Sequence, residues 1–185
     1  YLFDENYTLP EKISIFAQNY ASYFGFNFLL FEGAPVLIHS TNYGGELYLS
    51  TYLLFILSLI IVTHKKNFFD KFTFLIVMNL PFAPAAASVV NIPQHAHRSL
   101  LLGLYMFLLS CYGFQYFIQE KSNKIKNIFI WAILLLLITQ IIAYLNFYYR
   151  YYPEKSLPWF KSYGLKEALA TAIKQNPKKI IISNL

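Results

Sequence analysis

The segment from His95 to Arg98 places two imidazoles and a guanidinium within four residues of one another. Two histidines could contribute to a metal site, but zinc sites need three or four protein ligands, and as extras the chain offers His39 and a few Glu. We therefore assign no metal ligand. A guanidinium beside two imidazoles is suited instead to a phosphate or pyrophosphate group. The competing interpretation is an interfacial Arg98 that extends to lipid phosphates, and spacing alone does not separate the two.

A second group of polar side chains lies in the segment 31–48. Its Gly and Pro content predicts a loop, which runs directly into an apolar stretch. Polar groups beside a membrane are costly unless paired, so such a cluster is a candidate site; the alternative is a solvated loop that merely enters the bilayer. Its candidate residues are Glu32, His39, Asn42, Tyr43 and Glu46.

Several familiar signals are missing from the sequence. The chain has no Gly-rich phosphate loop, no Gly-x-Ser-x-Gly motif and no Cys/His nucleophile pair. Its basic residues do not interleave with aromatic residues on one exposed face, so we expect no nucleic-acid partner.

The composition determines what kind of protein positions these groups. Of the 185 residues, 57% are hydrophobic and 13% are charged, which is about half the charged fraction of an average soluble domain. So much apolar surface excludes a disordered chain, and a single cysteine, Cys111, excludes a disulfide-stapled domain. One soluble domain of this length does not need such hydrophobicity. A membrane protein remains.

Four apolar stretches approach the roughly 20 residues that a helix needs to cross a bilayer; they span 47–63, 72–90, 99–118 and 128–147. In the second stretch, Asn79, Pro81 and Pro84 interrupt the apolar run. Because proline removes a backbone donor and kinks a helix, we expect that span to be bent or broken.

The connecting loops predict the orientation. The loops 64–71 and 119–126 carry three Lys each, whereas the loop 91–98 between them carries a single Arg. Short loops rich in Lys and Arg stay cytoplasmic. We therefore predict a multi-pass protein of the plasma or inner membrane, with the loop 91–98 and both chain ends on the external side.

Both polar ends have patterns of their own. Thr8 and Glu11 fit a capping box, and the aromatic face that follows predicts a helix lying at the membrane interface or, equally, one packed on the protein. At the other end, Tyr148–Pro153 resembles an aromatic belt. A helix is expected from Gly164 and a buried strand over Lys178–Ser183.

These patterns predict an all-α polytopic membrane protein with four transmembrane helices and an interfacial helix, followed by the start of an external α/β domain. The expected divisions are an external segment 1–46, a transmembrane region 47–147 and an external segment 148–185. Both ends look cut, so we expect an internal piece of a longer protein.

The order of these elements resembles the later membrane region of GT-C glycosyltransferases that use polyprenyl-phosphate sugars, the group of protein O-mannosyltransferases and aminoarabinose transferases. The resemblance rests on three short signatures. They are Leu30–Gly33 with His39 and Gly44–Tyr48, then Pro93–Leu100, which is similar to a Pro-His-x-x-Arg element with Gln94 inserted, and finally Tyr148–Pro153 with Tyr163–Leu169.

The resemblance implies an inverting enzyme of the cell envelope that moves a sugar from a lipid carrier to a protein, lipid or glycan acceptor at the external membrane face. Such a reaction needs a carboxylate base and stabilisation of the leaving phosphate. The family has its acidic residues in a first external loop outside this chain, so no residue here is assigned as catalytic, and we expect this piece alone to be inactive. No cofactor is expected, although a divalent metal is compatible with a family whose members differ in metal use.

The same resemblance assigns Arg98 and His95 to the carrier phosphate, with His97 as the alternative to His95 because of the inserted Gln94. His39 and Glu46 match its loop pattern and would contact the sugar or the acceptor, together with the neighbouring Asn42 and Tyr43. Two other functions remain open. The interrupted second span is typical of transporters or flippases, and the loops could also be partner surfaces of a structural membrane subunit.

Overall fold

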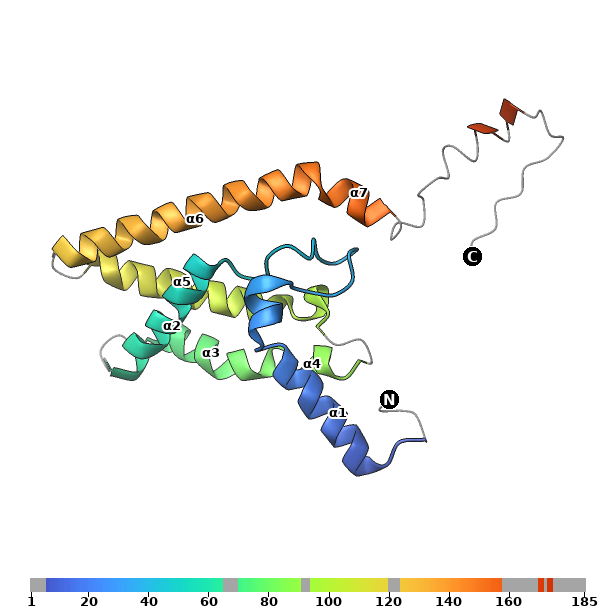
Figure 1. Ribbon diagram of the computed structural model, residues 1–185. Helices are drawn as coiled ribbons and strands as arrows, with labels where there is room; N and C mark the ends of the chain where they lie inside the picture. Colours follow the sequence, from blue (N-terminus) through green and yellow to red (C-terminus); the bar gives the residue numbers. More distant parts are fainter. Residues whose placement is uncertain are drawn as a thin grey trace.

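The computed structural model describes residues 6–64, 70–90, 94–119, 124–157, 170–171 and 173–174. Within these residues all regular structure is helical (Figure 1). The α-helices are α1 (Leu9–Ser22), α2 (Leu49–His64), α3 (Lys71–Asn79), α4 (Ala85–Ser88), α5 (Leu100–Gln119), α6 (Lys124–Arg150) and α7 (Tyr152–Ser156). A π-helical turn, η1 (Asn27–Phe31), and two 3-10 turns, η3 (Leu80–Phe82) and η4 (Ala96–Arg98), lie between them. The strand expected over 178–183 and most of the helix expected from Gly164 fall outside the described residues, so the external α/β domain stays a prediction.

Three of the four predicted spans form helical segments long and apolar enough to cross a membrane: Lys71–Ser88, α5 and α6, with 18, 20 and 27 residues. The apolar helix α2 has 16 residues, or about 24 Å at 1.5 Å per residue. The hydrocarbon core of a bilayer is about 30 Å thick. Helix α2 alone is therefore shorter than the hydrocarbon core, so the span predicted over 47–63 is not confirmed.

The predicted break in the second span is confirmed. Helix α3 ends at Asn79, η3 contains Pro81, and α4 begins directly after Pro84. A backbone carbonyl that loses its helical partner at such a break must find another donor when it lies at membrane depth. Here the Tyr20 hydroxyl, at the end of α1, donates to the Pro81 carbonyl at 2.6 Å.

Helices α2 and α5 pack against each other in the bundle. Ser58 Oγ donates to the Leu109 carbonyl at 2.5 Å, and Ser110 Oγ donates to the Thr51 carbonyl at 2.8 Å. A Cβ placed on Gly113 would lie 2.8 Å from a carbonyl oxygen of α2. Small side chains therefore allow the two backbones to approach closely, as is common between helices in membranes.

Helix α1 projects from the bundle (Figure 1) and contains no buried residue. Its predicted capping box is present, because the backbone N–H and the hydroxyl of Thr8 both donate to Glu11 Oε2 at 2.7 Å. At its other end, Asn19 Nδ2 donates to the carbonyls of Ser88 and Val90 at 3.3 and 3.1 Å. Only the last turns of α1 are therefore tied to the bundle, while the contact of its aromatic face with a membrane stays a prediction.

Helix α6 runs along one side of the bundle (Figure 1), and Ile133 is its one buried residue. Large apolar side chains such as Trp131 and Leu135 are 71% and 65% exposed, as expected of a surface that meets lipid. The helix continues to Arg150, past the boundary predicted at residue 147. Tyrosines are compatible with helix, and Pro153 lies in the first turn of α7, where a missing N–H costs nothing.

Candidate functional site

The loop 32–48 folds back onto the π-helical turn before it. The backbone N–H groups of Gly44, Glu46 and Leu47 donate to carbonyl oxygens of η1 at 2.9, 3.1 and 2.9 Å. At Gly45, an added Cβ would overlap the backbone of η1, so no larger residue fits there. The glycines that predicted a loop therefore also fix where this loop lies.

The outer part of the loop is held by the C-terminal helices. The ring of Tyr43 stacks on Phe147 of α6, with centroids 4.2 Å apart and planes 7° from parallel. The hydroxyl of Tyr152 in α7 donates to the Leu37 carbonyl at 2.6 Å. Tyr152, from the predicted aromatic belt, and Phe147, at the end of the predicted fourth span, thus position the loop.

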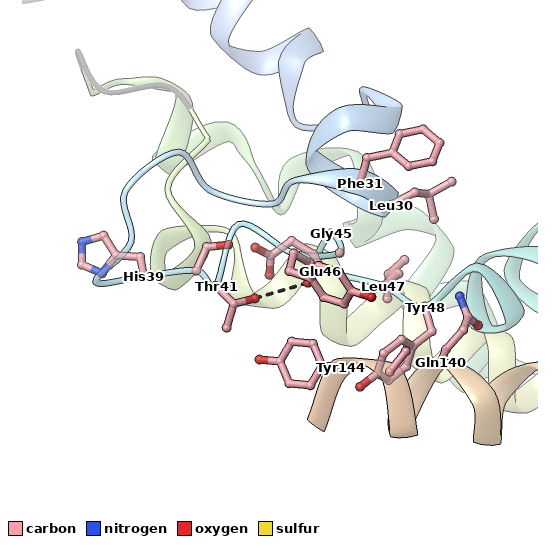
Figure 2. Close-up of a pocket in the computed structure, with 14 residues that line it drawn as sticks. Leu30, Phe31, His39, Thr41, Gly45, Glu46, Leu47, Tyr48, Gln140 and Tyr144 are labelled. Atoms are coloured by element: carbon pink, nitrogen blue, oxygen red, sulfur yellow. Dashed lines mark hydrogen bonds between the residues drawn. The ribbon is translucent and has the colours of Figure 1, made fainter. Parts of the chain in front are cut away.

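A cavity of about 590 Å³ lies between this loop and α6, within the size range of small-molecule sites. Figure 2 shows His39 at one end of it and Gln140 and Tyr144 of α6 along its wall. Its described lining comprises Leu30, Phe31, His39, Ser40, Thr41, Tyr43, Gly44, Gly45, Glu46, Leu47, Tyr48, Gln140, Ala143 and Tyr144.

Glu46 is the carboxyl group among these lining residues. Burial raises its pKa from 4.5 to about 6, because a low-dielectric environment disfavours the charged form. No described residue donates a hydrogen bond to this carboxyl or pairs with it. Carboxyl groups with such raised pKa values gather at functional sites.

The second loop of the site, residues 94–98, is hydrogen-bonded to the end of α1. Gln94, which interrupts the predicted Pro-His-x-x-Arg pattern, has a left-handed φ of 58°, and its Nε2 donates to the Ser22 carbonyl at 3.2 Å. The His95 N–H donates to the Tyr23 hydroxyl at 2.9 Å, and the Tyr23 side chain is 0% exposed. The extra residue thus forms a turn, and His95 takes its position from the core.

The two loops bring three histidines together. The ring centroid of His39 lies 4.2 Å from that of His95 and 4.6 Å from that of His97, and the latter two are 6.3 Å apart. One ring nitrogen from each lies within 4.8 Å of the others, close enough for the three to hold a metal ion. The sequence assigns no metal ligand, because His95 and His97 are too few by themselves and nothing in it places His39 beside them. His39, from a distant loop, supplies the third.

Within this histidine cluster (His39, His95 and His97), the surroundings of His95 favour its uncharged ring. The pKa of His95 is lowered, first by burial and then by the nearby His39, Arg98 and His97. The Nδ1 atoms of His39 and His95 are buried, and neither has a hydrogen-bond partner among the described residues.

Arg98 lies beside the cluster at the end of η4, two residues before α5 begins. Its backbone N–H donates to the His95 carbonyl at 3.1 Å, while its side chain is exposed. Within the described part of the chain no carboxylate forms an ion pair with it. The guanidinium is therefore available to an anion at the edge of the cluster.

The structure brings most of the predicted site residues to one end of the bundle. His39 belongs to both the cluster and the cavity, and Tyr43 and Glu46 line the cavity. Asn42 is different: it is exposed, has a φ of 51°, and its N–H donates to Ser40 Oγ at 3.0 Å, so it serves as a turn residue. Sequence reasoning missed Gln140, a polar residue in an otherwise apolar stretch, and Tyr144 one turn later.

Comparison of the chain with protein-family models, with curated proteins and with solved structures gives no match.

Proposed function

We propose that this chain is part of an integral-membrane glycosyltransferase that transfers a sugar from a polyprenyl-phosphate carrier to an acceptor at the external membrane face. The observation that carries the proposal is the contact between the two loops, with the rings of His39 and His95 4.2 Å apart. Residues assigned separately to the carrier phosphate and to the sugar or acceptor thus adjoin one cavity.

The charge distribution suits a phosphate at the cluster. Arg98 offers a guanidinium without an ion-pair partner among the described residues, and guanidinium–phosphate hydrogen bonds are among the strongest that proteins make. Glu46 lies farther into the cavity (Figure 2), where its carboxyl would accept a hydrogen bond from a hydroxyl of the sugar or acceptor. The carboxylate base is not assigned to a residue of this chain.

A second cavity supports a carrier with a long apolar chain. It measures about 360 Å³ and lies between α2, α5 and α6. Its described lining is mostly apolar: Ser50, Thr51, Leu54, Phe107, Ser110, Cys111, Phe114, Gln115, Ile118, Gln119, Ile133, Leu134 and Leu137. Ser50 lines this cavity, and its backbone N–H donates at 3.2 Å to Gln140 Oε1, which lines the first. A headgroup in one cavity would leave its tail beside the other.

The three helices able to span a bilayer support a membrane location. The ends of α2 and α5 at His64 and Gln119 adjoin the two Lys-rich loops, and the loops 32–48 and 94–98 adjoin the opposite ends of these helices. By the charge rule the cluster is therefore external, in a multi-pass protein of the plasma or inner membrane. The acceptor would be a protein, lipid or glycan.

The test is transfer from a radiolabelled polyprenyl-phosphate sugar in membranes that contain the full-length protein. Arg98→Ala removes charged hydrogen bonds worth about 1.5–3 kcal/mol, so we expect transfer at limiting donor to fall about 10- to 150-fold. Arg150→Ala, at the end of α6, is the matched control and should retain transfer. If Arg98→Ala transfers as well as wild type at equal protein levels, Arg98 contacts only lipid headgroups.

A transporter or flippase for a lipid-linked substrate is the second candidate. The interrupted helix α3–η3–α4 favours it, because discontinuous helices line many transport sites. Reconstitution into vesicles with a fluorescent polyprenyl-phosphate lipid separates the two functions. Movement of the lipid between leaflets, without sugar transfer from any donor, would favour transport.

A further inference from the structure

We infer that His39, His95 and His97 form a binding site for one zinc ion at the mouth of the cavity. The inference rests on the arrangement of these side chains and holds whether or not the chain transfers sugars. A zinc ion bound by three histidines keeps a fourth position open for water or another ligand.

The first argument is the geometry of the three rings. One nitrogen from each histidine lies within 4.8 Å of the others, while nitrogens around a tetrahedral zinc are about 3.3 Å apart, given Zn–N bonds of about 2.0–2.1 Å. Small rotations of the imidazoles close this difference. The ligands come from two loops, which is typical of a site formed by the fold and not by a single motif.

The second argument is the state of the nitrogens. The Nδ1 atoms of His39 and His95 are buried without a hydrogen-bond partner in the described residues. Buried polar atoms are nearly always paired, and each exception calls for an explanation such as a bound water or ion. A metal bound by ring nitrogens of the cluster explains why these two half-buried imidazoles lie with their centroids only 4.2 Å apart.

The third argument is that the backbone holds these ligands in place. His95 is held by the hydroxyl of the buried Tyr23, and Ala96, which separates the two histidines, is itself buried. The segment that carries His39 is held by the bond from Tyr152 to the Leu37 carbonyl. Ligands held before binding lose little conformational freedom when a metal arrives.

The choice of metal follows from the donor atoms. Imidazole nitrogens suit zinc, copper, iron and nickel, whereas magnesium and calcium prefer oxygen ligands. No carboxylate belongs to the cluster among the described residues. Three histidine nitrogens with the fourth tetrahedral position open are a known zinc ligand set, so zinc fits a three-nitrogen site partly open to solvent. One consequence rests on the proposed function: the ion would add positive charge beside Arg98, where the carrier phosphate would bind.

Zinc binding to the purified chain in detergent micelles tests the inference. We expect one equivalent of zinc per chain after equilibrium dialysis, measured by mass spectrometry of the metal, and the visible absorption of tetrahedral Co²⁺ when cobalt replaces zinc. His97→Ala should weaken binding by more than about 100-fold, since loss of an outer-shell partner already costs about 10–100-fold. His97 is exposed, so this change leaves the packed residues in place.

The chain supplies a matched control and a rescue. His64, the remaining histidine, is exposed at the far end of α2, and His64→Ala should bind zinc like wild type. His97→Cys offers a thiolate at the same position and should restore binding. Absence of stoichiometric zinc in the wild type, or equal losses in the His97→Ala and His64→Ala variants, would overturn the inference.

Sugar transfer is measured separately, so the two proposals fail independently. Transfer without zinc binding would leave the function and remove the metal site. Zinc binding without transfer would leave the metal site and remove the function.

Discussion

Replacing Glu46 with Gln should make the protein more stable at neutral pH. Its carboxyl is buried in the cavity wall without a partner among the described residues, and burial raises its pKa from 4.5 to about 6. The folded protein therefore binds this proton more tightly than the unfolded chain does. The stabilisation from the protonated form is complete below pH 4.5 and is lost as the pH rises through 6.

The size of the effect follows from these two values. The difference between 4.5 and about 6 corresponds to about 2 kcal/mol of folding free energy. Because the side chain keeps part of its surface in solvent, we expect about 1–2 kcal/mol. Glutamine is neutral at every pH, so Glu46→Gln should exceed the wild type by this amount at pH 7.5 and match it at pH 4.

Thermal unfolding followed by circular dichroism, between pH 4 and pH 8 in one detergent, measures this difference. Subtracting variant from wild type at each pH cancels the titration of all other groups. Glu32→Gln is the control, because Glu32 is exposed on the same loop; it should leave the profile unchanged. A Glu46→Gln variant that is less stable at pH 7.5 would refute the reasoning, because the carboxylate would then have a stabilising partner.

Two further substitutions test how the loop 32–48 is held. Gly45→Ala places a Cβ against the backbone of η1 and should lower the stability of the fold by about 2 kcal/mol or more. Its control is Gly103→Ala, in open space on α5, which should raise stability by about 0.5–1 kcal/mol. Thermal unfolding compares the two variants. Tyr152→Phe removes the 2.6 Å hydrogen bond to the Leu37 carbonyl and should cost about 1 kcal/mol, with protease cleavage of the loop accelerated. Tyr149→Phe, at a side chain 73% exposed, should change neither quantity.

Much of the fold could be predicted because apolar periodicity and proline act locally. The break in the second span follows from Pro81 and Pro84 alone, and the capping box at Thr8 depends on a residue three positions away. The length of α2 could not be predicted in the same way. Its apolar run begins at Leu47, but the N–H of Leu47 bonds to η1, so helix starts two residues later.

The sequence identified most of the residues of the candidate site but not how they are arranged in space. His95, His97 and Arg98 adjoin one another in the sequence, so their proximity is local. The addition of His39 depends on how the loop folds onto η1 and α6, contacts that no spacing rule encodes. Gln140 was visible as a polar residue in an apolar run, but only packing places it in the same cavity lining as Glu46.

The broken span and the histidine cluster are connected through one buried side chain, Tyr23. Its hydroxyl contacts the Ala87 carbonyl in α4, at 3.4 Å, and accepts the His95 N–H at 2.9 Å. The kinked segment that ends in α4 thus sets the position of Tyr23, and Tyr23 sets the position of His95 beside His39. Tyr23→Phe keeps the ring and removes both contacts.

We expect that variant to lose about 1–3 kcal/mol of stability, because the His95 N–H is left without its partner. It should also weaken zinc binding about 10-fold, in the range found for groups that orient a metal ligand. Tyr20→Phe is the control: its hydroxyl binds the Pro81 carbonyl in the same broken span, but it does not touch the second loop. Both variants should lose stability, and only Tyr23→Phe should lose zinc affinity. Equal zinc affinity in the two would show that the cluster takes its geometry from the loop 32–48 alone.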